Sequence, residues 1–83
     1  MIQLKKVVLP RELWPRRDDW SGKVVELHVS IGDKVDVGTP LVDVEIEKAI
    51  LTIESDVKGI VKYIHVSKGD EVSPGTTLLE IEV

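Results

Sequence analysis

Apolar and polar residues alternate along much of the second half of the chain, and this alternation predicts β-strands. Every second residue is apolar from Val42 to Ile46, and the same pattern returns from Leu79 to Val83. A period of two turns one set of side chains inward and the other outward, so Asp43 and Glu45 should face solvent. The residues expected to share the inward face of these runs are Val42, Val44, Ile46, Ala49, Leu51, Ile53, Leu79, Ile81 and Val83.

Turn-forming residues interrupt the strand-like runs at short intervals. Pro74-Gly75 suits the central positions of a type II turn, because proline presets one dihedral and glycine tolerates positive φ. No window predicts an amphipathic helix, so the chain is predicted to be all-β. The other turn signals are Gly22, Gly32-Asp33, Val37-Gly38, Gly59 and Gly69-Asp70.

The sequence contains an internal repeat. Residues 22–46 align with residues 59–83 without a gap, and twelve of the aligned pairs are identical. Two copies of one strand-turn-strand unit, each with one apolar face, should pack against each other. The predicted fold is therefore a flattened β-barrel or sandwich of two small antiparallel sheets related by a pseudo-twofold axis.

The repeat also predicts where one lysine lies. The first copy continues through the turn at Glu47-Lys48, whereas the second copy ends at Val83. Lys48 and the C-terminus should therefore lie at opposite poles, and the strand from Ile2 to Leu9 should lie beside the C-terminal strand.

Composition narrows the classes of function. The 83 residues predict a single domain, residues 1–83, with a core too small to enclose a deep active-site cavity. A net charge of −4 without a basic stripe argues against nucleic acid or an anionic membrane as the main partner. No apolar run is long enough to span a bilayer, and the N-terminus lacks the charged-then-apolar pattern of a signal peptide, so we expect a cytoplasmic protein. We also expect the isolated domain to be monomeric. Cysteine is absent, which excludes thiolate metal sites and protein thiol nucleophiles.

Four motifs together resemble the biotinyl/lipoyl carrier domain family. They are Gly-x-Val-x-x-x-x-Val from Gly22, Gly-Asp-x-Val-x-x-Gly-x-x-Leu from Gly32, Val-Glu-x-Glu-Lys-Ala from Val44, and Val-x-Gly from Val57. The resemblance covers nearly the whole chain from Gly22 onward. It implies a non-catalytic carrier whose cofactor is bound covalently to Lys48.

The neighbours of Lys48 favour lipoate over biotin. Biotin carriers of this family place methionine on both sides of the lysine, whereas lipoyl domains usually contain Val-Glu-Thr-Asp-Lys-Ala. Residues 44–49 resemble the lipoyl form, with Ile for Thr and Glu for Asp, and the only methionine is Met1. The resemblance implies a swinging arm serving a 2-oxo acid dehydrogenase complex or a related lipoate-dependent system. Its implied partners are a lipoate-attaching ligase and the enzymes of that complex. A biotin carrier and an unmodified interaction module of the same fold remain the alternatives.

The residues around the lysine and the first long loop are candidates for partner recognition. Glu45, Glu47 and Ala49 flank Lys48, and the acidic residues are more simply solvated strand positions than a catalytic group. Residues 9–22 form a longer loop, richer in tryptophan and arginine, than lipoyl domains usually have there. Packing of Trp14 or Trp20 on the end of the core is the favoured interpretation. The functional alternative is a contact surface beside Lys48 formed by Trp14, Arg16 and Arg17.

The two histidines related by the repeat are predicted to be surface residues. His28 and His65 each lie between apolar neighbours, so alternation turns them outward, and no third ligand has suitable spacing. We therefore predict no metal site and no catalytic residue. Asp33 and Asp70, in the Gly-Asp turns, are expected to bind local backbone amides.

Overall fold

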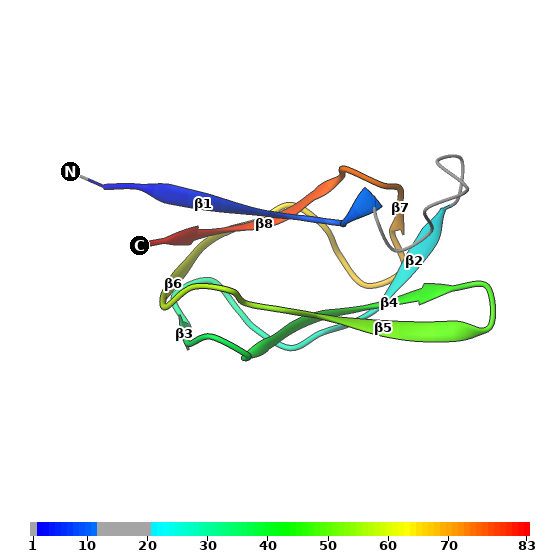
Figure 1. The fold of residues 1–83 in the computed structure, drawn as a ribbon, viewed down its shortest axis with the longest axis horizontal. Helices are drawn as coiled ribbons and strands as arrows, with labels where there is room; N and C mark the ends of the chain where they lie inside the picture. The colour runs from blue at the N-terminus through cyan, green and yellow to red at the C-terminus, as the bar shows by residue number, and fades with distance from the viewer. Residues whose placement is uncertain (1, 12–20) are drawn as a thin grey trace.

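The computed structural model describes residues 2–11 and 21–83 and contains two four-stranded antiparallel sheets packed face to face (Figure 1). The strand order is β1-β8-β6-β3 in sheet A and β5-β4-β2-β7 in sheet B. No strand pairing among the described residues joins one sheet to the other, so the predicted all-β fold is a sandwich and not a closed barrel. The strands are β1 (Leu4–Val8), β2 (Gly22–Leu27), β3 (Lys34–Val35), β4 (Pro40–Ile46), β5 (Ala49–Glu54), β6 (Gly59–Ile64), β7 (Glu71–Val72) and β8 (Thr77–Glu82).

The pseudo-twofold symmetry predicted from the repeat is present in the backbone. The strands β2, β3 and β4 of the first copy correspond to β6, β7 and β8 of the second, and the two sheets have equivalent strand orders. Hydrogen bonds between the copies are reciprocal. The amide of Gly32 donates to the carbonyl of Val61 at 2.8 Å, and the amide of Gly69 donates to the carbonyl of Val24 at 2.7 Å. Each copy therefore supplies hydrogen-bond partners to the other, and the two half-buried units are stable only together.

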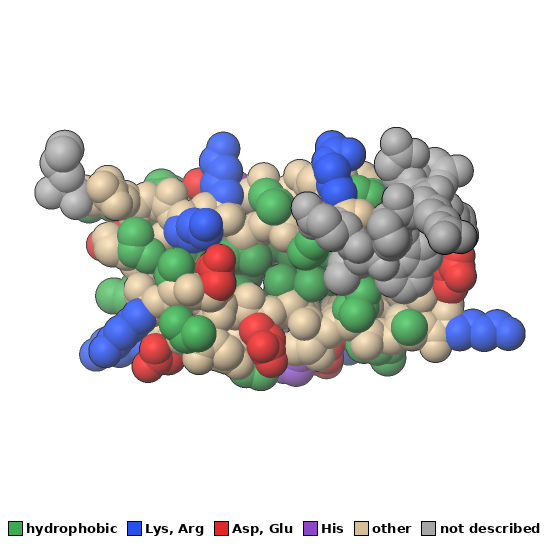
Figure 2. All heavy atoms as spheres, viewed as in Figure 1, with side chains coloured by type: hydrophobic (Ala, Val, Ile, Leu, Met, Phe, Trp, Pro, Cys, Tyr) green, Lys and Arg blue, Asp and Glu red, His purple; other side chains and the backbone are tan. Residues whose placement is uncertain are grey.

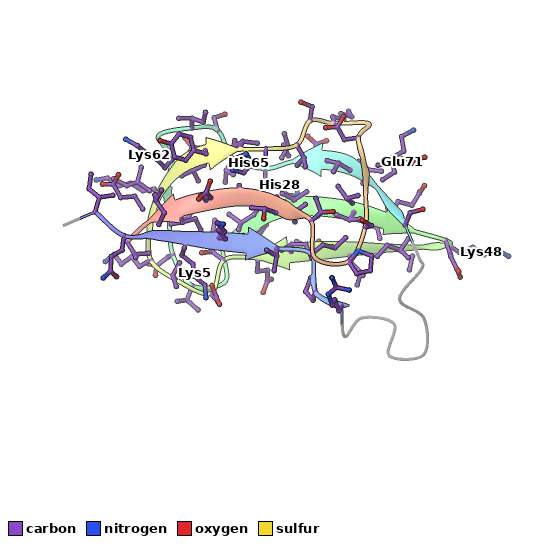
Figure 3. The ribbon with its side chains drawn as sticks, turned by 90° about the horizontal axis from the view of Figure 1, so that it is seen from above. Lys5, His28, Lys48, Lys62, His65 and Glu71 are labelled. Atoms are coloured by element: carbon purple, nitrogen blue, oxygen red, sulfur yellow. The ribbon has the colours of Figure 1, made fainter. Side chains whose placement is uncertain are left out.

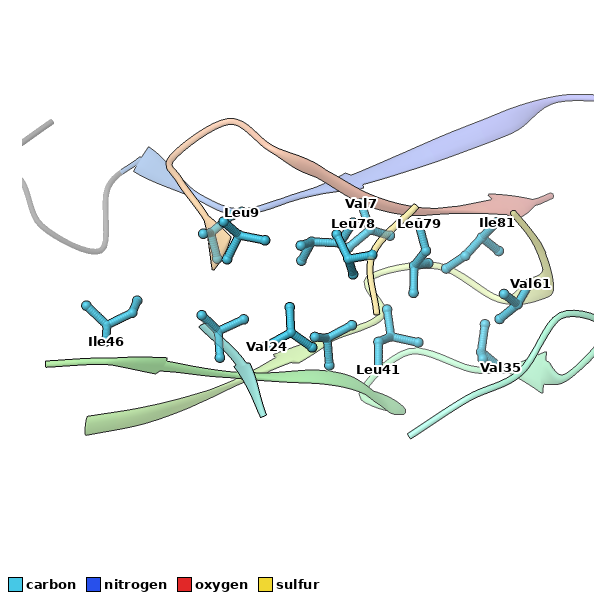
Figure 4. Packing of buried hydrophobic residues seen from close by; sticks show 14 residues of the cluster. Val7, Leu9, Val24, Val35, Leu41, Ile46, Val61, Leu78, Leu79 and Ile81 are labelled. Carbon is cyan, nitrogen blue, oxygen red and sulfur yellow. The ribbon is translucent and has the colours of Figure 1, made fainter. Parts of the chain in front are cut away.

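The core consists of aliphatic side chains from the inner faces of both sheets (Figure 4). The alternation predicts it well, because Val42, Val44 and Ile46 are fully buried while Asp43 and Glu45 point outward. The buried apolar residues are Val7, Leu9, Val24, Val35, Leu41, Val42, Val44, Ile46, Val61, Val66, Val72, Leu78, Leu79 and Ile81.

Three positions depart from the strict inward pattern. Leu41 is as buried as its neighbour Val42, because the pairing of β4 with β5 is irregular at this point. Val83 is 50% exposed, since it follows the end of β8. Ala49 is exposed as well, although Leu51 and Ile53 beyond it are half-buried. Alternation assigns a face of the sheet, but burial also requires that other parts of the chain cover that position.

Tight turns join the strands as the sequence predicts. At Ser73-Pro74-Gly75-Thr76 the amide of Thr76 donates to the carbonyl of Ser73 at 3.0 Å, and Gly75 has a φ of 88°, as a type II turn requires. The Gly-Asp turns are closed by their aspartates. The Asp33 and Asp70 carboxylates each accept a 2.8 Å hydrogen bond from the backbone amide of the serine three residues earlier.

The long axis of the molecule, 38 Å in extent, separates the chain ends from one hairpin (Figure 1). Strand β1 pairs with β8, so the termini meet at one pole, as predicted. The β4–β5 turn lies at the other pole.

On the side where β1 and β5 form the open edges, apolar side chains reach the surface between the sheets (Figure 2). No helix in the described part of the chain is long and apolar enough to cross a membrane.

Candidate functional site

The β4–β5 hairpin presents Lys48 at its tip. Ile46 pairs with Ala49, so Glu47 and Lys48 alone form the turn. The Lys48 side chain is exposed and projects from the end of the sandwich (Figure 3). Glu47 has a φ of 55° and is the only non-glycine residue with positive φ in the described part of the chain. The chain therefore adopts an uncommon backbone conformation to reverse direction in two residues immediately before the lysine.

The base of this hairpin is held firmly. Strand β4 is bonded on one side to β5 and on the other to β2, and Val44 and Ile46 are fully buried. Gly22 makes the approach of β2 possible. A Cβ atom at Gly22 would lie 2.6 Å from Cγ1 of Val44 and 3.0 Å from Cγ1 of Ile46. Close packing fixes the strands below the tip, while the lysine itself is exposed.

Charged and apolar side chains surround the tip on the outer face of sheet B. Glu45 lies opposite Ile50 on one side and Lys23 on the other. Glu45, Glu47 and Ala49 are all exposed, so the structure brings these three predicted recognition residues together around Lys48. Ile50, which is 61% exposed, was not singled out by the sequence. Its outward place could have been read from the alternation that starts at Ala49.

The predicted contact residues of the first long loop, Trp14, Arg16 and Arg17, lie outside the described residues. The chain just before this loop is held in place by a backbone hydrogen bond and by packing at Leu9. The Leu9 amide donates to the carbonyl of Thr76 at 2.9 Å, and Leu9 is fully buried. The Arg16 and Arg17 assignment, like that of Trp14, stays a prediction.

Both histidines are exposed, as predicted, but each has an acidic partner that the sequence analysis missed. Nε2 of His28 lies 3.0 Å from a carboxylate oxygen of Asp43, and Nε2 of His65 lies 2.6 Å from one of Glu80 (Figure 3). The sequence offers one signal for these pairs, because Asp43 and Glu80 occupy equivalent positions in the two copies, but the repeat by itself does not select these carboxylates over other acidic residues. In the described part of the chain, no group of three or more His, Cys, Asp or Glu residues is arranged to hold a metal ion.

The Asp43 carboxylate has a perturbed ionisation. The Thr52 hydroxyl donates a 2.7 Å hydrogen bond to its carboxylate and lowers the pKa of Asp43, with a smaller contribution from His28. Partial burial acts in the opposite direction without reversing the shift. This side chain fastens β4 to β5 on the outer face, beneath the tip.

Comparison with known proteins places the chain in a family. The Biotin_lipoyl family model, described as biotin-requiring enzyme, matches residues 19–81, which is most of the chain. The chain belongs to this family. As a biotinyl/lipoyl domain it also has a solved structural relative, whereas no curated protein sequence matches it.

One such structure is the lipoyl domain of the 2-oxoglutarate dehydrogenase complex from Azotobacter vinelandii, solved in solution. It superposes with a TM-score of 0.70 at 24% sequence identity, covering 94% of each chain. This biotinyl/lipoyl domain therefore has the fold of a lipoyl domain, and the sequence-based prediction of fold and family is confirmed.

Proposed function

We propose that this domain is a lipoyl carrier, with lipoate in amide linkage to Nζ of Lys48. The place of Lys48 carries the proposal. The lysine is exposed in a two-residue turn, on a hairpin with a buried base, at the pole away from the termini. An attaching enzyme needs an open approach to the amine, and a rigid base holds that amine in one position.

Amide formation removes the positive charge of Lys48 and creates a long flexible arm. Bound lipoate supplies a dithiolane that is reduced and reoxidised and that carries acyl groups. The contribution of the chain is positional, because tethering keeps the group at high effective concentration near successive active sites. The domain itself catalyses no step.

Lipoate is favoured over biotin by two observations. Glu47-Lys48-Ala49 resembles the lipoyl motif and lacks flanking methionines, and the solved relative is a lipoyl domain. Biotin is the second candidate, and the description of the matching family as biotin-requiring enzyme favours it.

The proposed partners are a lipoate-attaching ligase and the enzymes of a 2-oxo acid dehydrogenase or related system, in the cytoplasm. The dehydrogenase origin of the structural relative supports the choice of system. The exposed residues Glu45, Glu47 and Ala49 are available to such partners at the tip. Contacts from Trp14, Arg16 and Arg17 belong to the same proposal.

Intact-mass spectrometry tests the attachment. The domain is expressed once with a lipoate ligase and lipoate, and once with a biotin ligase and biotin. We expect a single lipoyl increment that is lost in Lys48→Arg, which keeps the charge but cannot form the amide. Lys68→Arg is the matched control, because Lys68 is also exposed in a tight turn and should leave the increment unchanged.

A biotinyl increment without a lipoyl one would replace the proposal by the biotin alternative. Absence of any increment would favour an unmodified interaction module. A lipoyl increment that persists in Lys48→Arg would show that another residue is the attachment point.

A further inference from the structure

The two outer faces of the sandwich differ in chemistry although the repeat makes them equivalent. In β2, Lys23 and Glu26 point outward from sheet B, where they pair with the outward Glu45 and Asp43. The equivalent residues of β6, on the outer face of sheet A, are Ile60 and Tyr63. The fold therefore tolerates charges at these positions, and sheet A has apolar side chains there instead.

A third apolar side chain lies on the same face. Leu4 of β1 pairs with Glu82 of β8, which pairs in turn with Ile60 of β6, so all three side chains share one row. The exposed fractions are 42% for Leu4, 41% for Ile60 and 46% for Tyr63. We refer to Leu4, Ile60 and Tyr63 as the sheet A patch. Its tyrosine ring stacks on His65, with ring centroids 6.3 Å apart.

The charges around the sheet A patch largely cancel. Glu82 lies 3.8 Å from the Lys62 amine, and Glu80 is bonded to His65. Strand register places three lysines and two glutamates on this face, against one lysine and five acidic residues on the outer face of sheet B. The charged residues are Lys6, Lys34, Lys62, Glu80 and Glu82 on sheet A, and Lys23, Glu26, Asp43, Glu45, Glu54 and Glu71 on sheet B.

We propose that the sheet A patch is the contact surface of a weak symmetric dimer of this chain, in place of the monomer expected from the sequence. A twofold axis brings a surface against itself, and a face with both signs of charge can place its lysines against the glutamates of the other copy. The outer face of sheet B would instead meet its own excess of carboxylates and repel. Tyrosine is enriched at the centres of interfaces, and the charged residues beside it would belong to the polar rim.

The size of the face limits the strength of this contact. The molecule measures 38 × 21 × 19 Å, so one broad face offers at most roughly 800 Å² per copy, about that of a standard stable interface. The sheet A patch covers only part of that area, so association should be weak. Lys62 beside the patch and Lys48 lie at opposite ends of the molecule (Figure 3), which leaves both Lys48 tips free in the dimer. The proposal does not depend on whether Lys48 is modified.

Sedimentation equilibrium over a concentration series tests the dimer. From about 10 µM to about 1 mM, the average mass of the unmodified domain should rise from that of one chain toward that of two. Ile60→Lys installs the residue that the equivalent position of β2 carries, and it should weaken association at least about tenfold. Ile50→Lys is the matched control. It makes the same change at an exposed isoleucine on sheet B and should leave association unchanged.

A constant single-chain mass at all concentrations would overturn the proposal, as would equal weakening by the two isoleucine variants. Weakening by Ile50→Lys alone would assign the contact to sheet B and refute the sheet A patch. Circular dichroism of each variant checks folding. Should Ile60→Lys fail to fold, Tyr63→Glu gives the same test, since glutamate is the equivalent residue of β2.

Discussion

Replacing Ile46 by alanine should remove a large share of the folding stability. Ile46 is fully buried in the core at the base of the β4–β5 hairpin. The change deletes three carbon atoms, which at about 0.8 kcal/mol each amounts to roughly 2.4 kcal/mol of lost transfer free energy. The cavity left behind adds to this, so the free energy of unfolding should fall by about 3–4 kcal/mol. A chain of this length has roughly 4–12 kcal/mol in total.

Val83→Ala is the matched control, because Val83 occupies the same position of the repeat as Ile46 but is 50% exposed. It should cost less than about 1 kcal/mol. Urea denaturation of both variants, followed by circular dichroism, measures the two losses, and the m-value should stay unchanged. Equal losses for Ile46→Ala and Val83→Ala would refute the reasoning that burial in the folded chain, and not the position in the repeat, sets the cost of the change.

Three further outcomes are expected. The folded-state pKa of Asp43 lies below its usual value, so the contribution of this carboxylate to the free energy of unfolding should be complete above about pH 4 and should be lost as acid protonates it. Thr52→Val removes the hydrogen bond to Asp43 and should reduce this loss, measured by thermal unfolding between about pH 6 and pH 2. Gly22→Ala should destabilise the domain by about 1–3 kcal/mol in urea titrations, since its Cβ would meet Val44 at 2.6 Å. Lys48→Ala should change the unfolding free energy by less than about 0.5 kcal/mol, and a larger loss would assign this tip residue a structural role.

Several features of the fold could be predicted because they depend on local pattern alone. The alternation from Val42 to Ile46 fixes which side chains face inward, and the gap-free repeat fixes which strands correspond. Together they also predicted that Lys48 lies at the pole opposite the termini. These predictions succeeded because side-chain direction in a strand has a period of two, and because two half-buried copies can bury their apolar faces only against each other.

The acidic partners of the histidines could not be assigned with the same certainty. Which carboxylate reaches His28 depends on strand register and on the irregular pairing between β2 and β4. The sequence suggests several outward acidic residues at similar separation, and only the backbone geometry selects Asp43.

By itself, the sequence determined an all-β fold of two packed sheets, its internal symmetry and a lysine at a hairpin tip. The tertiary structure decided what the symmetry leaves open. It forms a sandwich and not a closed barrel, and it buries Ile46 but exposes Val83, because the parts of the chain that cover a position are set by the tertiary arrangement and not by the repeat. It also gathers Leu4, Ile60 and Tyr63 on one outer face, because side chains from β1 and β6 become neighbours only once β8 is paired between these strands. The repeat makes two positions equivalent in sequence, whereas the burial and contacts of each side chain depend on the residues that surround it in the folded chain.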